Sequence, residues 1–593
     1  MRDAPLTLEP AGRTRLGRIF HDTLSGYLRA LPAGSRRFWL LVPLTGLIAG
    51  LGAVGSVGIL KAVQRLAWGH DSLLTGTLAA SPLRRVLVPL AGGALIVLTG
   101  SLFRVPPKGH GTSSLIEAIW VRRGNVQLRW ALYYGLLSLV VVGLGASLGR
   151  EGALVYFGAA TGSWLGRRFE VERDQLKLLV ACGAAAGYAA AYNTPIGGAL
   201  LALEVFLGGL ALELYGPLIF ASVTATLVSR ALLYDHPSYV IPHYRLDHAS
   251  EVPLYLVLGV LVGGLSALFV RAVEVSAQLA ATIPTRAQRL LPLFAMLLVG
   301  LIGVHYPQVY GNGYDTVNLA LAGQLSLSLL LILPALKLAL SVLCASSGMP
   351  GALFTPSLYI GCLAGSAFGV AAQHLFPHVV TSPGGYAIVG MAAILAGSTH
   401  ATLAAGLLLF ELTGSYDLIL PLLAAAVVST AISRAITAES IYTAPLKRRG
   451  VELPRLARPA WMQREGVRGL VRADAPQVRP AATLDEVLLA LSTVPDGDEL
   501  FVVDDSGRLC GAIALDAVRD AVADQPDLKL LIAADLTTPT GAVSVDASLW
   551  DVTRRALAAG SAHLPVLSPR EGNRFVGTIA IHEVLAAAAK TPA

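Results

Sequence analysis

The tetrapeptide Gly149-Arg150-Glu151-Gly152 follows directly on the apolar stretch Trp130–Leu148, so two ionisable side chains stand in the middle of a hydrophobic region. Ionisable residues inside a membrane are costly and are usually retained for function. Two interpretations are open at this point. Arg150 and Glu151 form a structural ion pair, or they mark a polar site inside a membrane.

The composition of the whole chain is that of a membrane protein. Of its 593 residues, 54% are hydrophobic and 14% are charged, and the mean hydropathy is +0.63, whereas about a quarter of the residues in a soluble domain are charged. The long apolar stretches lie between residues 39 and 446. We therefore predict an N-terminal cytoplasmic segment (1–37), a transmembrane domain (38–446), a linker (447–466) and a soluble domain (467–593).

Basic residues at both ends of the apolar region predict the orientation of the chain. Arginines precede the first apolar stretch, and Lys447-Arg448-Arg449 follows the last one. The positive-inside rule places both ends in the cytoplasm. No short apolar core with a small-residue cleavage site follows the first arginines, so we expect no cleavable signal peptide. The prediction is a multi-pass protein of the plasma membrane, which in a bacterium is the inner membrane.

Charge and cysteine content bear on the possible partners. The net charge is +7, but the basic residues cluster beside the apolar region, where anionic lipid headgroups rather than nucleic acid are the expected partner. The four cysteines are scattered without CxxC or His-rich spacing, so neither a disulfide framework nor a metal site is indicated. No hydrolase or oxidoreductase constellation occurs, and we do not expect an enzyme.

The apolar region contains an internal repeat. The matching segments are Gly109-His110-Gly111 with Gly311-Asn312-Gly313, Gly162–Gly166 with Gly365–Gly369, and the run ending at Glu204 with the run ending at Glu411. Their offsets are 202, 203 and 207 residues. Small-residue spacings are common in packed membrane helices, but chance does not explain the shared order and offset. We predict an α-helical polytopic membrane protein of two inverted halves, whose broken, tilted helices meet at a binding site.

The repeat brings two irregular turns into equivalent places. At an offset of 203, Glu151 corresponds to Phe354 in Ala352-Leu353-Phe354-Thr355-Pro356. Each turn leads into a helix, and a helix N-terminus offers unpaired N–H groups with a partial positive charge. Such a site favours an anion without a fixed counter-ion, so the repeat favours an anion pathway over a structural ion pair.

These loops resemble those of the CLC family of chloride channels and transporters. That family lines its anion path with loops of the forms GSGIP, GREGP and GxFxP and with a tyrosine near the end of the membrane region. The counterparts here are Gly109-His110-Gly111-Thr112-Ser113, Gly149-Arg150-Glu151-Gly152-Ala153, Ala352-Leu353-Phe354-Thr355-Pro356 and Tyr442. The resemblance covers about residues 38 to 446 and implies a homodimer with one anion pathway in each subunit.

The resemblance also implies roles for individual residues. Glu151 becomes the gate, whose carboxylate can occupy the place of a permeating anion. The amides of Leu353 and Phe354 and the hydroxyl of Tyr442 contact a central chloride ion, with position 110 as their partner. The complete anion-binding set is His110, Gly111, Arg150, Gly152, Leu353, Phe354 and Tyr442.

His110 and Ala352 depart from the family pattern, which usually has serine or proline at the first position and glycine at the second. A neutral His110 would donate a hydrogen bond to the anion much as a serine hydroxyl would. An imidazolium, which forms near neutral pH, would instead add a pH-dependent attraction. Both interpretations of His110 are open, and so is the selectivity among small anions.

Val205 bears on the mode of transport. Proton-coupled relatives have two successive glutamates where this chain has Glu204-Val205, and the second takes protons from the cytoplasm. A valine binds no proton, and Glu204 lies about 100° away around a helix. Some exchangers are thought to manage without that glutamate. The sequence predicts a passive chloride channel gated by Glu151. The alternatives are a chloride/proton antiporter and an anion-sensing or structural membrane protein without transport.

The C-terminal region contains two similar units, Val478–Arg519 and Val543–Val584, each predicted as strand, turn, strand and helix. They resemble tandem CBS domains, which many CLC proteins carry and which can bind adenine nucleotides. An acidic residue after the second strand often meets the ribose, and Asp516 stands at that place in the first unit. At most one adenine-nucleotide site is predicted, and a dimerisation module without ligand is the alternative.

Overall fold

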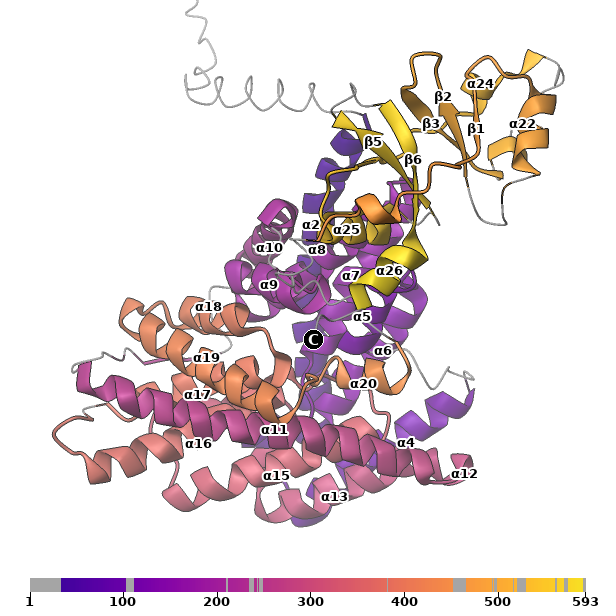
Figure 1. Cartoon of the computed structure of the whole chain (residues 1–593). Coiled ribbons are helices and arrows are strands. Elements are labelled where there is room, and N and C mark those ends of the chain that lie inside the picture. Colours follow the sequence, from indigo (N-terminus) through magenta and orange to yellow (C-terminus); the bar gives the residue numbers. More distant parts are fainter. Residues whose placement is uncertain are drawn as a thin grey trace, which may run out of the picture. The chain divides into compact units, whose positions relative to one another are not determined.

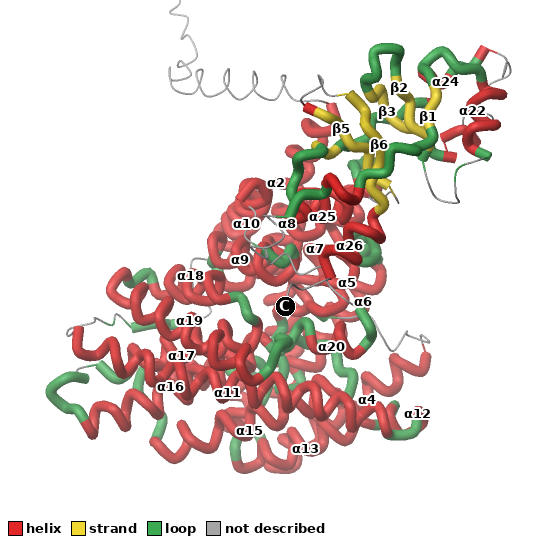
Figure 2. The backbone as a smooth tube through the Cα atoms, viewed as in Figure 1, coloured by secondary structure: helices red, strands yellow, loops and turns green. Residues whose placement is uncertain are grey.

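The computed structural model describes residues 33–102, 111–209, 212–233, 239–242, 244, 249–380, 382–451, 465–492, 494, 499–515, 517–519, 530–559, 563–569 and 574–589. The chain divides into two compact units, Met1–Arg455 and Leu456–Ala593. The first is built from helices and is called the helical unit (Figure 1). The strands lie in the second, called the α/β unit (Figure 2).

The helical unit consists of two halves. The first contains α2 (Ala33–Trp68), α3 (Leu73–Ala79), α4 (Pro82–Leu102), α5 (Thr112–Trp120), α6 (Leu128–Gly143), α7 (Glu151–Arg168), α8 (Arg173–Tyr192), α9 (Pro195–Leu201), the π-helix η1 (Ala202–Phe206) and α10 (Leu212–Leu233). The second contains α11 (Val252–Thr282), α12 (Thr285–Gln288), α13 (Leu291–His305), α14 (Tyr314–Leu321), α15 (Leu327–Ser346), α16 (Phe354–Leu375), α17 (Gly384–Thr399), α18 (Thr402–Thr413), α19 (Ile419–Ile436) and α20 (Ala444–Arg448).

The order of helices repeats between the halves, which confirms the duplication. Helices α5, α6, α7, α9 and α10 correspond to α14, α15, α16, α18 and α19, whose first residues follow after 202, 199, 203, 207 and 207 residues. The packing repeats as well, because α2 packs on α10 as α11 packs on α19, and α7 packs on α8 as α16 packs on α17. Short runs of irregular backbone separate the equivalent helices.

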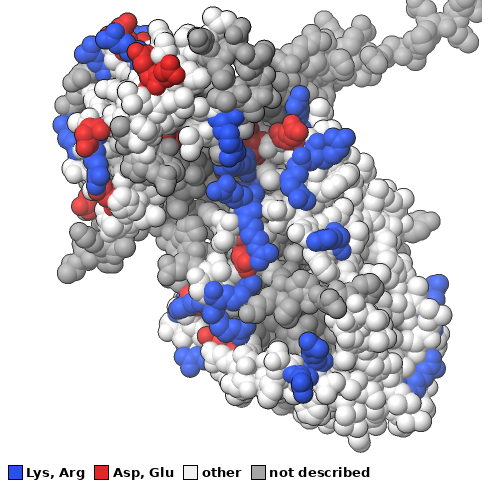
Figure 3. Space-filling model, turned by 90° about the vertical axis from the view of Figure 1, so that its right-hand side faces the viewer, with Lys and Arg blue, Asp and Glu red and all other residues white. Residues whose placement is uncertain are grey.

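Helix length supports the prediction of broken helices. Among the described residues, seven helical segments are long and apolar enough to cross a membrane, and five further apolar helices have only 10 to 17 residues. A perpendicular span needs about 20 residues, so the five shorter helices are too short to cross a membrane fully by themselves. On the face drawn in Figure 3, the surface of the helical unit is formed mainly by uncharged residues.

Equivalent pairs of glycines allow close helix contacts in both halves. A Cβ on Gly158 of α7 would lie 2.1 Å from the carbonyl oxygen of Gly183 on α8. In the second half, a Cβ on Gly361 of α16 would lie 2.4 Å from the carbonyl oxygen of Gly390 on α17. Small residues at helix crossings are typical of membrane bundles, where backbone approach supplies the packing energy.

The α/β unit contains two three-stranded sheets with the same topology. Its elements are β1 (Gln477–Val478), α22 (Leu484–Leu491), β2 (Leu500–Val503), β3 (Leu509–Ile513), α24 (Ala533–Leu536), β4 (Val543–Ser544), α25 (Leu549–Ala559), β5 (His563–Ser568), β6 (Arg574–Ala580) and α26 (Ile581–Ala589). In each sheet the first two strands pair in parallel and the last two antiparallel, with a register shift at the equivalent place. This repeat is the architecture that the sequence predicts for a CBS pair.

Candidate functional site

The two equivalent loops of the repeat lie against each other. The N–H of Gly149 donates to the carbonyl of Ala352 at 2.8 Å, and the N–H of Ala352 donates back at 3.0 Å. The pairing is antiparallel, as inverted halves require. Helix α7 begins two residues after Gly149, at Glu151, and α16 begins two residues after Ala352, at Phe354. Two helix N-termini are thereby brought to one place.

Close contacts explain the small residues in these loops. A Cβ on Gly149 would lie 2.0 Å from Oε2 of Glu151, because the carboxylate folds back over this glycine. A Cβ on Gly152 would meet the Cβ of Ala352 at 3.3 Å. Ala352, which departs from the family pattern, is therefore accommodated because glycine stands opposite it at position 152.

Glu151 is buried, with no exposed surface. The hydroxyl of Tyr314, the first residue of α14, donates to its Oε1 at a long distance of 3.4 Å. Its Oε2 has no hydrogen-bond partner among the described residues. The guanidinium of Arg150 lies over the ring of Tyr314, 5.3 Å from the centroid, and no salt bridge joins it to Glu151 in the described part of the chain. Among the described residues, the Glu151 carboxylate therefore has one long side-chain hydrogen bond and no salt bridge.

Aromatic side chains surround the start of α16. The ring of Phe354 lies 5.2 Å from the rings of both Tyr188 and Tyr192 on α8. The hydroxyl of Tyr192 is 2.8 Å from Oγ1 of Thr355. Helix α8 therefore fixes the first turn of α16 on one side, while the paired loop fixes it on the other.

Tyr442 joins this group from the end of the helical unit. It is 5% exposed, and its hydroxyl oxygen has no hydrogen-bond partner among the residues that the structure describes. Helix α20, which begins two residues after Tyr442, packs on α5. Thr112 begins α5, directly after Gly111, whose φ of +91° favours glycine. The N-termini of α5, α7 and α16 and the Tyr442 hydroxyl thus belong to one site.

A cavity opens beside Glu151. Its volume is about 140 Å³, and Arg150, Asn312, Tyr314 and Asp315 are among its lining residues. Asp315 is held by the hydroxyl of Ser72 at 2.8 Å. Tyr314 thus both lines the cavity and donates to the buried carboxylate of Glu151.

Two predicted site residues, His110 and Asp516, lie outside the described residues, and their roles stay predictions. The other members of the predicted set all belong to the three helix N-termini or to the segment before α20. They are Gly111, Arg150, Glu151, Gly152, Leu353, Phe354 and Tyr442. The sequence did not single out Tyr188, Tyr192, Tyr314 and Lys337. Lys337 could have been recognised from the sequence, because it is a charged residue in the apolar stretch Leu325–Leu343.

A second pair of equivalent residues joins the halves away from these loops. The two carboxylate oxygens of Glu204 accept from the N–H groups of Leu403 and Ala404 in the first turn of α18, both at 3.3 Å. Those of Glu411 accept from Ile196 and Gly197 in the first turn of α9, at 3.2 and 2.8 Å. Each glutamate caps the short helix of the opposite half, an arrangement favoured by the helix dipole.

Val205 follows Glu204 in the π-helix η1 and packs, partly buried, against the hydrophobic core. Isolated π-turns are frequent at functional sites. The side chain at this position carries no titratable group. The carboxylate next to it, that of Glu204, is directed to backbone donors of α18.

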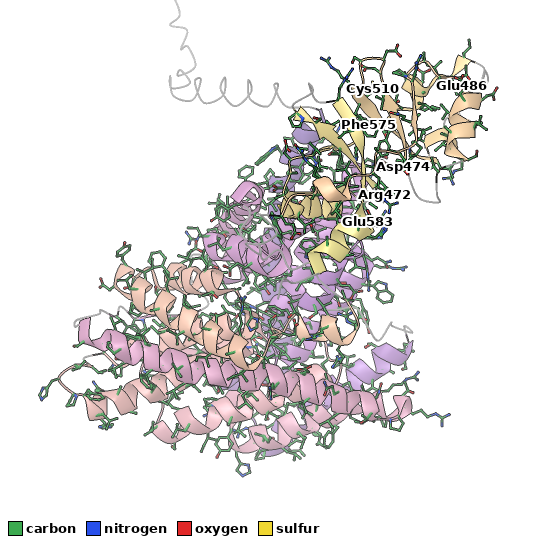
Figure 4. All side chains as sticks on the ribbon, in the orientation of Figure 1. Arg472, Asp474, Glu486, Cys510, Phe575 and Glu583 are labelled. Carbon is green, nitrogen blue, oxygen red and sulfur yellow. The ribbon has the colours of Figure 1, made fainter. Side chains whose placement is uncertain are left out.

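In the α/β unit, the segment before β1 pairs with the second sheet. Arg472 and Thr578 of β6 exchange two backbone hydrogen bonds of 2.8 and 2.9 Å. The side chains of Arg472 and Glu583 form a salt bridge, and Figure 4 shows them together. The rings of Phe501 and Phe575 lie 5.5 Å apart, so the two repeats also contact each other through their sheets.

Comparison with known proteins agrees with this architecture. The family model described as voltage gated chloride channel matches residues 92–434. A putative chloride channel protein, ClcB-like, from Ralstonia nicotianae is 36% identical over 419 residues, which cover 69% of this chain and 97% of that protein.

Two solved structures share the fold. A slow cyanobacterial Cl⁻/H⁺ antiporter superposes with a TM-score of 0.63 at 24% identity, covering 70% of this chain and 98% of that chain. A eukaryotic CLC transporter superposes with a TM-score of 0.64 at 19% identity and covers 92% of this chain and 97% of its own. The second match extends beyond the helical unit into the α/β unit.

The fold and the sequence together define a multi-pass membrane protein built from two related helical halves with a C-terminal α/β pair. The chain belongs to the voltage-gated chloride channel (CLC) family. Members of this family are anion channels or transporters rather than enzymes.

Proposed function

We propose that this protein is a passive chloride channel whose gate is the carboxylate of Glu151. The support is its position at the N-terminus of α7, fully buried, with one oxygen unpartnered among the described residues and the other weakly held. A helix N-terminus attracts an anion. The ionised carboxylate competes with chloride for that place, and protonation releases it.

The central chloride would be bound by groups at the three helix starts. The proposed donors are the amides of Leu353 and Phe354 and the hydroxyl of Tyr442. Gly111, Gly152 and Arg150 supply backbone and positive potential, and His110 is proposed as a further donor. The buried Tyr442 hydroxyl, which lacks a hydrogen-bond partner among the described residues, supports this assignment, because buried polar groups are rarely left unsatisfied.

One observation carries the choice of a channel over an antiporter. Position 205 is a valine, and both oxygens of its neighbour Glu204 accept hydrogen bonds from the backbone of α18. A charge at bilayer depth needs a titratable relay, and this position supplies none. The alternative, a chloride/proton antiporter, is favoured by the fold shared with the cyanobacterial Cl⁻/H⁺ antiporter.

Reconstituted vesicles with opposed chloride and pH gradients distinguish the two. For a channel, the reversal potential equals the chloride equilibrium potential at every pH gradient, and a chloride gradient moves no protons uphill. A reversal potential that moves systematically with the pH gradient would establish the antiporter and refute the channel. A complete lack of anion flux would instead support the non-transporting alternative.

We further propose a homodimer with one pathway per subunit, both termini in the cytoplasm and the bacterial inner membrane as its location. Exposed apolar side chains on the equivalent helices α10 and α19, such as Leu227 and Leu420, are available for a subunit or lipid contact. The boundaries 1–37, 38–446, 447–466 and 467–593 remain proposals. An adenine nucleotide at Asp516 in the α/β unit is also a proposal.

A further inference from the structure

A lysine lies buried in the second half of the helical unit. Lys337 of α15 has no exposed surface. Its ammonium donates to the carbonyls of Gly311 at 2.6 Å and Val309 at 3.0 Å, and it lies 5.1 Å from the centroid of the Tyr359 ring. In the part of the chain that the structure describes, no carboxylate forms a salt bridge with it. A buried intramembrane ammonium is costly and therefore points to a function.

The carbonyl of Gly311 connects Lys337 to the gate from one side. Gly311 belongs to the turn that precedes α14, and its φ is +57°. Three residues later stands Tyr314, whose hydroxyl donates to Glu151. A change in the position of this turn therefore moves the residue that contacts the gate carboxylate.

The carbonyl of Val309 connects Lys337 to the gate from the other side. It also accepts from the hydroxyl of Ser147 at 3.1 Å. Ser147 lies four residues before Glu151, and its oxygen is 3.4 Å from that of Ser341, which stands one turn after Lys337 on α15. Both segments that position Glu151 thus converge on the same turn of α15.

Several charged or titratable groups interact electrostatically with Glu151. They are Arg150, Tyr188 and Tyr192 of α8, Tyr239, Tyr314 of α14, Lys337 of α15 and Tyr442. Two of them, Arg150 and Lys337, carry basic groups. Arg150 lines the cavity, whereas Lys337 is enclosed by protein.

We infer that Lys337 is a positioning residue of the gate, whose ammonium holds the two gate segments together and favours the ionised, closed form of Glu151. The inference rests on the proposed role of Glu151 as the gate. A nearby positive charge favours a carboxylate over its protonated form. Without that charge, Glu151 accepts a proton more readily, so the channel should open at higher pH.

The test measures the pH of half-maximal chloride flux in vesicles containing the full chain. Lys337→Met removes the charge and the donors, Lys337→Gln removes the charge but keeps a donor, and Lys337→Arg keeps the charge. Lys337→Met and Lys337→Gln should shift the midpoint upward by about one pH unit. Lys337→Arg should have the midpoint of the original chain. Arg271→Gln, which removes an exposed cation of α11 outside this network, should leave the midpoint in place.

Glu151→Gln, measured alongside the Lys337 variants, separates this inference from the gate itself. If Glu151→Gln alone keeps the original pH response, the gate proposal fails. If Glu151→Gln is insensitive to pH but Lys337→Gln in the original chain shows an unshifted midpoint, the gate stands and the role of Lys337 is refuted. An equal shift in Lys337→Arg and Lys337→Gln would also refute it, because it would show that charge is not the cause. If Lys337→Met does not fold, the Gln and Arg variants decide.

Discussion

The two halves of the helical unit agree at one pair of equivalent positions and differ at another. Glu204 and Glu411 make the same contact, each capping the short helix of the opposite half. At the paired loops, by contrast, Glu151 in one half corresponds to Phe354 in the other. Equivalent residues that keep the same chemistry stabilise the duplicated fold. The pair whose chemistry has diverged lies where we propose the pathway.

The largest expected effect comes from removing the charge that distinguishes the paired loops. In the original chain, chloride flux should rise by up to about tenfold per pH unit on acidification, because protonation of Glu151 opens the path. Glu151→Gln should conduct at all pH values with little pH dependence. Flux from vesicles at pH 4.5 to 7.5, a range of about three units, measures this.

Glu411→Gln is the matched control for the gate variant, because it makes the same chemical change in a structural glutamate. It should keep the pH response of the original chain. An undiminished response in Glu151→Gln, or an equal loss in both variants, would contradict the assignment of the gate to the diverged position.

Much of the difference between the two halves could be predicted from the sequence. The duplicated segments predicted two halves, and the glycines around Glu151 predicted an irregular turn before a helix, which begins at Glu151. The sequence could not predict that Gly149 and Ala352 pair through backbone hydrogen bonds, because such pairing leaves no side-chain pattern. It also did not predict the contacts of Tyr188, Tyr192 and Tyr314, since tyrosine is common in packed helices.

The reciprocal glutamate caps show a second limit of prediction from the sequence. The offset of 207 residues predicted that Glu204 and Glu411 are equivalent. Only the structure shows that each reaches the helix of the other half. A carboxylate in an apolar run is compatible both with a proton carrier and with a helix cap. The spacing of residues in the sequence cannot distinguish these two roles. The contact partners do, because two backbone N–H groups occupy both oxygens of each side chain.

The next largest effect tests the symmetry of these caps. Glu204→Ala and Glu411→Ala each remove two charge-assisted hydrogen bonds and leave helix N–H groups without partners, at a cost of about 1–3 kcal/mol. The two variants should lower the unfolding temperature of the detergent-solubilised protein by similar amounts. Neither should change the dependence of the reversal potential on pH. A change in that dependence for Glu204→Ala alone would show that the caps differ in function.

A smaller effect is expected at position 110, where one half has His110 and the other has Asn312. If the imidazole contacts the central anion, His110→Ser replaces one donor with another. We expect the chloride-to-nitrate permeability ratio to change by roughly fivefold, which corresponds to about 1 kcal/mol for one hydrogen bond. Asn312→Ser at the equivalent position is the matched control and should leave the ratio unchanged. An unchanged ratio in His110→Ser would place His110 outside the pathway.

A separate effect, on nucleotide binding rather than on anion flux, is expected in the α/β unit, where the same comparison of repeat and divergence applies. The two repeats share their topology, but the residue after the last strand has diverged, with Asp516 after β3 and His582 near the start of α26. A carboxylate can accept hydrogen bonds from both ribose hydroxyls, whereas a neutral imidazole has a single acceptor.

ATP binding to the full chain, measured by calorimetry, should therefore weaken by about tenfold in Asp516→Ala, since hydrogen bonds to a charged group contribute about 1.5–3 kcal/mol. His582→Ala should bind as the original chain does. Equal weakening in both variants would refute the assignment, and absence of binding in all three proteins would favour a dimerisation module without ligand.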